Sequence, residues 1–141
     1  MLLKGTVFTG PHRGGPLIEK FKQRIAGLIC YEPYPGTMGI KLSNPIDFED
    51  FATKRVEHIL IDGSKKTDLL IAPAKLKYKE NTTDCWACVQ PKGIYHEDVV
   101  ELLAKENLKN TLEINDGDEI ELELVKRELP KRKSSIFRNI F

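Results

Sequence analysis

Thr37 and Gly39 lie in the stretch of the sequence best suited to hold a cation or a phosphate. They follow the turn signal Pro35-Gly36 and begin a segment that alternates like a β-strand, with Thr37, Gly39 and Lys41 on one face. The residues of the opposite, core-facing side are Met38, Ile40 and Leu42. Glycine inside a strand marks a bulge or a close approach, so we expect open space at Gly39 where the Thr37 hydroxyl contacts metal or phosphate. A strand entry in which threonine serves only as a β former is the alternative.

A glycine-rich loop, GPHRGGP, follows the first expected strand and precedes an expected helix. Backbone N–H groups in such a loop, backed by a helix N-terminus, bind anions. The loop matches neither the G-x-x-x-x-G-K-[ST] nor the G-x-G-x-x-G phosphate motif, although His12 and Arg13 add cationic donors. A phosphate-binding loop and a plain glycine turn both fit these residues.

Glu101 is the third candidate for a functional residue. It lies in EDVVELLAKENLKNTL, residues 97–112, whose apolar spacing predicts a helix. Glu97 and Asp98 would occupy the first turn of that helix, where the macrodipole favours acids. Glu101 instead falls at the edge of the apolar stripe, where a carboxylate could accept a hydrogen bond from a ligand hydroxyl in a cleft. Solvated helix surface is the alternative interpretation.

The CWAC motif, with Cys85 and Cys88, does not predict a redox or zinc site. It lies in DCWACVQ, which alternates as a strand, so the two thiols point to opposite faces. The remaining candidates for zinc ligands are Cys30, His12, His58 and His96. No second ligand pair has a recognisable spacing, so we expect all three cysteines to be buried structural thiols.

The other patterns indicate about six strands and a helix near each end of the chain. Expected strands cover residues 2–9, 37–42, 55–61, 67–79, 84–90 and 119–125, and expected helices cover residues 17–29 and 97–112. Residues 44–54 predict a loop with one helical turn begun by Pro45. Because these elements do not alternate as βαβ units, a mainly antiparallel small barrel with peripheral helices is the favoured fold.

Composition places the chain among soluble globular proteins. Its 141 residues fit one domain, with 40% hydrophobic and 30% charged residues. No apolar run approaches the roughly 20 residues of a membrane span, and the start MLLKGTVF alternates like a strand rather than forming a signal peptide. We therefore expect a monomeric, cytoplasmic protein with a single domain at residues 1–125.

Residues 126–141 form a basic tail. They hold six basic residues and one acidic residue, whereas residues 1–125 hold 16 basic and 20 acidic ones. An acidic body is a poor nucleic-acid surface, so no nucleic acid is expected to bind the main domain. Apolar residues on one side of a short tail helix would allow weak contact with an anionic surface such as lipid. A solvated, frayed terminus is the alternative.

Taken together, these segments resemble the archaeal CTP-dependent riboflavin kinases, whose fold is a six-stranded cradle-loop barrel related to RIFT barrels. The resemblance spans roughly residues 3–125. Its markers are the glycine-rich loop and the stretches LICYEPYPGTMGIKL, YHEDVVELLA and LEINDGDEIELE. For the first stretch the family pattern is Leu-Gly-Phe-x-Pro-Tyr-x-Gly-Thr-Leu-Asn-Leu. The resemblance implies transfer of the γ-phosphate of CTP to riboflavin, giving FMN and CDP, with Mg²⁺ as cofactor.

The resemblance also implies the site residues. The loop wrapping the nucleotide phosphates would comprise Gly10, Pro11, His12, Arg13, Gly14 and Gly15, and the cytidine would lie against Glu106, Asn107, Leu108 and Lys109. Thr37 and Gly39 would mark the metal site. Ile94 and Glu101 would mark the flavin site, with Glu101 also the catalytic residue.

Three positions depart from the family pattern. Gly39 stands where the family has a metal-binding asparagine, so one oxygen ligand is missing and a water would take its place. Ile94 stands where the family has a flavin-contacting threonine, and it cannot hydrogen-bond. The glycine-rich loop lacks the family's Gly-x-Gly-x-Gly-Arg-Tyr pattern. The alternative function is therefore a divergent member that binds a nucleotide, a flavin or another small molecule without kinase activity.

Overall fold

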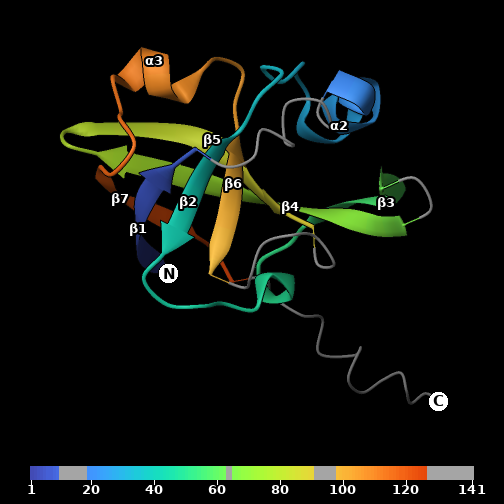
Figure 1. Ribbon diagram of the computed structural model, residues 1–141, viewed down its shortest axis with the longest axis horizontal. Coiled ribbons are helices and arrows are strands. Elements are labelled where there is room, and N and C mark those ends of the chain that lie inside the picture. Colours follow the sequence, from blue (N-terminus) through green and yellow to red (C-terminus); the bar gives the residue numbers. More distant parts are fainter. Residues whose placement is uncertain (10–18, 63–64, 91–97, 127–141) are drawn as a thin grey trace.

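The computed structural model describes residues 1–9, 19–62, 65–90 and 98–126 (Figure 1). Its strands are β1 Leu2–Phe8, β2 Met38–Leu42, β3 Lys54–Asp62, β4 Lys65–Tyr78, β5 Asn81–Val89, β6 Val99–Leu103 and β7 Glu119–Leu124. Its helices are α2 Lys22–Ile29, the 3-10 helix η1 Phe48–Asp50, and α3 Leu108–Leu112. No helix among these described residues is long and apolar enough to cross a membrane.

Six of the strands close into an antiparallel barrel. The sheet order is β3-β4-β5-β6-β2-β1-β7, and a further pairing of β4 with β7, over residues 74–77 of β4, closes the ring. The first half of the 14-residue β4 pairs instead with β3, which extends outside the closed ring. The expected mainly β barrel of six strands with peripheral helices is confirmed, with β3 as a seventh strand outside it.

Alternation along the strands builds the barrel core. In β7, for example, Ile120, Leu122 and Leu124 are buried in the interior, while the glutamates between them face outward. Helix α2 covers a second, smaller apolar cluster on the outer face, where Ile25 and Ile29 pack with residues of β3 to β6 (Figure 1). Every strand of the ring therefore contributes one face to a single core, and α2 shields part of the other face.

The helix expected over residues 97–112 is the main error of the sequence prediction. Residues 99–103 form β6, and only residues 108–112 are helical, in α3. All four apolar residues of β6 are buried, two of them inside the barrel, Val100 and Leu102. A run that is apolar on both faces has no clear period of two, so pairing with β2 and β5 decides its conformation.

Smaller differences concern one helical turn and one cysteine. The helix expected over residues 17–29 agrees with the described part, in which residues 19–20 are helical and α2 spans Lys22–Ile29. The turn expected from Pro45 begins instead at η1, where the Asp47 side chain accepts from the Glu49 N–H. Cys30 is exposed rather than buried, and it ends α2 in the left-handed conformation with φ 69°. The expectation for CWAC is confirmed, since buried Cys85 faces the barrel interior and buried Cys88 faces the cluster under α2.

Gly5 of β1 allows the close contact of β1 with β2. A β-carbon there would lie 2.5 Å from Cγ2 of Ile40 and 3.0 Å from the backbone oxygen of Lys41. We expect Gly5→Ala to lower the free energy of unfolding by about 1–3 kcal/mol through overpacking. Gly27→Ala is the matched control, because nothing lies within 4 Å of its β-carbon position in α2; it should add about 0.5–1 kcal/mol through helix propensity. Urea unfolding of both variants measures the difference, and equal stabilities would contradict the proposed packing.

Candidate functional site

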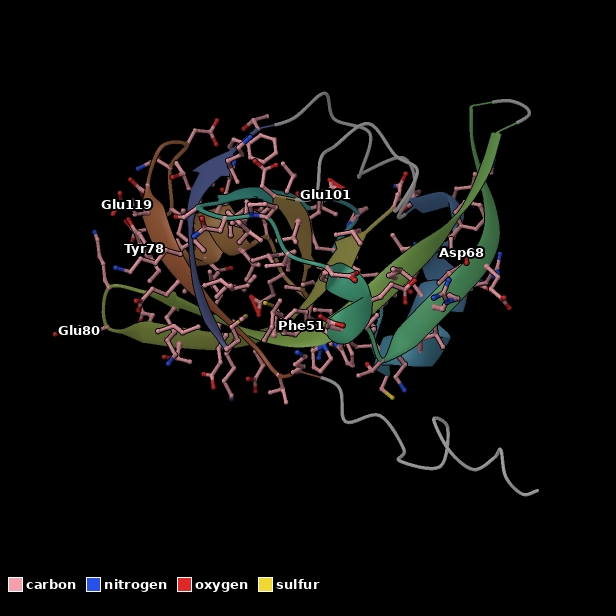
Figure 2. All side chains as sticks on the ribbon, turned by 90° about the horizontal axis from the view of Figure 1, so that it is seen from below. Phe51, Asp68, Tyr78, Glu80, Glu101 and Glu119 are labelled. Carbon is pink, nitrogen blue, oxygen red and sulfur yellow. The ribbon has the colours of Figure 1, made fainter. Side chains whose placement is uncertain are left out.

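Thr37 and Glu101 meet on the outer face of the barrel (Figure 2 labels Glu101). Thr37 directly precedes β2, and Glu101 lies in β6, where it pairs in register with Gly39. The Thr37 hydroxyl donates a hydrogen bond of 2.8 Å to Oε1 of Glu101. Two residues predicted to share a site are thus in direct contact, although Glu101 reaches it from a strand and not from a helix.

Burial sets the electrostatics of Glu101. It raises the pKa of the carboxyl above its ordinary 4.5, while the hydrogen bond from Thr37 acts in the opposite direction. Because the Thr37 hydroxyl donates its hydrogen bond to Glu101, the lone pairs of its oxygen can face another partner. The pair therefore offers two oxygens of the type that hard cations and substrate hydroxyls bind.

Cys88 of β5 lies opposite Glu101 in the register of β5 and β6. Burial, reinforced by the charge of Glu101, raises the pKa of this thiol well above 9.0. Burial likewise raises the pKa of Cys85 to about 12. Both thiols stay protonated at neutral pH, so neither is suited to act as a nucleophile or a thiolate ligand.

The open space expected beside Gly39 is absent. Gly39 is buried, and the ring of Phe8 from β1 covers it, at 2.8 Å from where a β-carbon would lie. Lys41, the next residue on this face, pairs with Asp98 at 2.9 Å. Glycine at position 39 permits the close approach of a neighbouring side chain. A glycine inside a strand predicts such an approach, but it does not identify the group that approaches.

Thr37 also borders a cavity of about 90 Å³. Tyr34, Gly36 and residues 106–109 also line this cavity. Asn107 caps α3 and donates from Nδ2 to the Tyr34 hydroxyl at 3.2 Å, whereas Leu108 is buried in the core. The predicted nucleotide segment therefore lies beside the predicted metal residue, within a hollow smaller than the ~300–1,000 Å³ of typical ligand pockets.

Lys109 links this segment to the end of β1. Its ammonium donates to Asp116 Oδ1 at 2.6 Å and to the Thr9 hydroxyl at 2.8 Å, and Thr9 donates to Asp116 Oδ2 at 2.6 Å. Thr9 is the last described residue before the glycine-rich loop. Sequence reasoning missed Phe8, Thr9, Tyr34 and Asp116; only the turn pattern NDGD hinted at the last of them.

Comparison with known proteins identifies the family. A family model described as CTP-dep_RFKase, domain of unknown function DUF120, matches residues 7–124. The chain belongs to the CTP-dependent riboflavin kinase family. The matched range includes Thr37, Glu101 and residues 106–109, so every part of the site described above lies within it.

Curated relatives within this family are archaeal riboflavin kinases. The chain is 30% identical over 127 residues to the riboflavin kinase of Methanosphaera stadtmanae, covering 87% of this chain and 97% of the relative. It is 26% identical over 130 residues to that of Aeropyrum pernix, covering 88% and 96%. It is 28% identical over 138 residues to that of Haloquadratum walsbyi, where the match covers 89% of this chain but 57% of the longer relative.

Several residues expected to act in the riboflavin kinase site lie outside the described part of the chain. These are Gly10, Pro11, His12, Arg13, Gly14, Gly15 and Ile94. Within the described part, no group of three or more His, Cys, Asp or Glu side chains could hold a metal ion. The site as described is therefore an oxygen pair, Thr37 and Glu101, next to the hollow lined by residues 106–109.

Asp116 gives the thermal stability of the protein a testable dependence on pH. The hydrogen bonds from Lys109 and then Thr9 hold the pKa of Asp116 below its ordinary 3.8. A lowered folded pKa contributes stability at pH values above 3.8 that is lost as the pH falls through the folded value. Asp116→Asn should therefore lower Tm at neutral pH, and the difference from wild type should shrink and disappear as the pH falls below 3.8 and through the lowered pKa of Asp116. Thermal unfolding across pH measures this, with the exposed Asp50→Asn as control; a difference that grows toward acid would contradict it.

Proposed function

We propose that the chain transfers the γ-phosphate of CTP to the 5′-hydroxyl of riboflavin, producing FMN and CDP. One observation carries this proposal: Thr37 donates a hydrogen bond to Glu101 and also borders the hollow lined by residues 106–109. A phosphoryl transfer needs the nucleotide phosphates and the accepting hydroxyl to meet at one point, because positioning supplies most of the rate. Thr37 lies at the junction of the two proposed substrate regions.

The oxygen pair fits Mg²⁺. Hydroxyl and carboxylate oxygens are ligand types that this ion prefers, and Mg²⁺ commonly takes one or two protein oxygens while phosphate and water complete its six. Thr37 would hold the ion directly, and Glu101 would orient the Thr37 hydroxyl by accepting its hydrogen bond. When bound, the ion would neutralise the negative charge that develops on the phosphate oxygens during transfer.

Glu101 also has lone pairs left to receive the 5′-hydroxyl of riboflavin. As the bond from the hydroxyl oxygen to the γ-phosphorus forms and the bond to the β-phosphate oxygen breaks, the hydroxyl proton passes to the carboxylate and CDP leaves. The raised pKa of Glu101 suits this role, because a base works best when its pKa approaches the operating pH. Ile94 would contribute an apolar contact to the flavin.

The nucleotide would lie between two segments. Residues 10–15 would bind its phosphates through backbone N–H groups and Arg13, and residues 106–109 would contact the cytidine. Tyr34, 40% exposed and held by Asn107, offers an aromatic face beside that segment. We further infer that the single barrel domain of residues 1–125 acts as a cytoplasmic monomer and that residues 126–141 are a basic tail outside the catalytic unit.

Product analysis tests the proposal. The chain is incubated with riboflavin, Mg²⁺ and each of CTP, ATP, GTP and UTP, and FMN and nucleoside diphosphate are quantified by chromatography. Equal amounts of FMN and CDP, formed fastest with CTP, would support it. Binding of CTP or riboflavin in calorimetry without FMN formation would instead favour a divergent family member that binds these ligands without transferring phosphate.

A further inference from the structure

An apolar groove of about 250 Å³ lies on the outer face of β4 and β5, beside the end of β7. Most of the described residues that line it are apolar, and two of them, Pro73 and Trp86, are register partners in β4 and β5. Tyr31 and Trp86 are half-buried, whereas Val125 is 68% exposed. Among the described residues, none that lines this groove also lines the hollow beside Thr37. The groove is therefore a separate surface, which the proposed reaction does not use.

The groove lies where the chain leaves the sheet. The pairing of β7 with β4 ends at Leu124 and Ala74. Pro73, which precedes Ala74, lacks the N–H that a further ladder bond would need, and residues 69–71 of β4 pair instead with β3. The chain after Val125 therefore cannot continue as a strand beside β4, and it leaves the sheet at the wall of the groove.

The residues that follow suit this groove in charge and in apolar content. Residues 127–141 hold five basic residues and one acidic residue, and they include the run IFRNIF at 136–141. The charged residues that line the groove are two acids and one lysine, Asp84, Glu123 and Lys75. Both acids already pair with lysines of β4, so charge favours the approach of a basic segment and apolar contact must supply the binding.

The size of the groove and the length of the chain favour the same occupant. The groove is smaller than the ~300–1,000 Å³ of typical ligand pockets, so a few apolar side chains suit it better than a whole small molecule. Residues 126–135 separate Val125 from the apolar run, and a link of that length reaches up to about 35 Å when extended. Because the groove begins at Val125, this link holds the run beside it at an effective concentration in the millimolar range.

We propose that residues 136–141 bind in this groove, so that the basic tail of the chain covers its own barrel. Phe137 and Phe141 contact Trp86, and the binding removes the apolar surface of Trp86 and Val125 from water. The inference concerns a surface away from the candidate site, and it does not depend on the proposed function.

Trp86 is the single tryptophan of the chain, so its fluorescence reports on the groove. The test compares wild type with the full-length variant Phe137→Ser/Phe141→Ser, and Ser134→Asn/Ser135→Asn is the matched control in the same segment. In the phenylalanine variant, the emission of Trp86 should shift to longer wavelength and acrylamide should quench it more strongly. The control should match wild type, and equal Tm values would show that all three proteins are folded.

A synthetic peptide of residues 127–141 tests the same contact between separate molecules. Added to the phenylalanine variant, it should reverse the shift with a half-maximal effect at or below about 1 mM, because a weaker contact would stay mostly open at the effective concentration of the link. Val125→Lys, with the tail unchanged, should also shift the emission of Trp86, since it adds a positive charge to the wall of the groove. Val125→Thr, which keeps the shape of valine without a charge, should not.

Identical emission and quenching of Trp86 in wild type and in the phenylalanine variant would overturn the inference. A wild-type signal that changes with protein concentration would also overturn it, because the tail of a second copy would then cover the groove. Shielding of Trp86 that appears only with dioleoylphosphatidylglycerol vesicles would do the same, because the groove would then bind anionic lipid instead of the tail.

Discussion

Glu101→Gln is expected to lower kcat for FMN formation by about 10²–10⁴-fold, the usual contribution of a general base. The amide is nearly isosteric and its oxygen can still accept the hydrogen bond from Thr37, but it cannot take the proton of the riboflavin hydroxyl. KM for CTP should change little, because the nucleotide contacts that we propose, with residues 10–15 and 106–109, do not include Glu101. Steady-state kinetics with riboflavin and CTP measures both constants.

Glu119→Gln is the matched control for this substitution. Glu119 is an exposed glutamate of β7, well separated from Glu101 in Figure 2. Its replacement should leave kcat within about threefold of wild type, as for a surface change away from the site. A Glu101→Gln enzyme with similarly preserved kcat would exclude the carboxylate as the base. Equal Tm values for the two variants would show that a loss of activity does not result from unfolding.

Thr37→Val should lower kcat/KM for CTP by about 10–100-fold and raise the Mg²⁺ concentration needed for half-maximal rate. Valine keeps the shape of threonine but removes the oxygen that we assign to the cation. It also removes the hydrogen bond that lowers the pKa of Glu101, so the pKa of that carboxyl should rise further. The acid limb of the rate profile should accordingly move to higher pH, because the base stays protonated over a wider range.

Thr37→Ser distinguishes the hydroxyl from the methyl group. Serine retains an oxygen able to donate to Glu101, and it should recover most of the rate and most of the Mg²⁺ response. Kinetics at a series of Mg²⁺ concentrations compares the two variants. If valine and serine behave alike, the site depends on packing at position 37 and the assigned oxygen is not a ligand.

Local patterns were sufficient to predict much of the barrel. The final strand alternates strictly, and the structure buries its isoleucine and leucines as that alternation predicts. The hairpin of β3 and β4 and the opposite faces of Cys85 and Cys88 follow from the same period of two, together with an Asp-Gly turn. These features depend on residues that lie close together in the sequence. The pattern of one short segment is therefore enough to predict them.

The conformation around Glu101 could not be predicted in the same way. The VVELL segment buries apolar residues on both sides, between the barrel interior and the cluster under α2. The spacing of its apolar residues therefore suits a buried helix as well as a strand. Only the pairing of this segment with β2 and β5 excludes the helix. The partners of those pairings lie tens of residues away, beyond the range of a local pattern.

By itself, the sequence determined the β-rich class, the candidate residues Thr37 and Glu101 and, through shared motifs, the riboflavin kinase family. Only the tertiary structure decided that these two side chains touch, at 2.8 Å across 64 residues of chain, and that Phe8 covers Gly39. The physical reason is register: strand pairing fixes which residues of β1, β2 and β6 lie opposite each other. A slip of one residue would turn each side chain to the other face, so the site exists only once the barrel has closed.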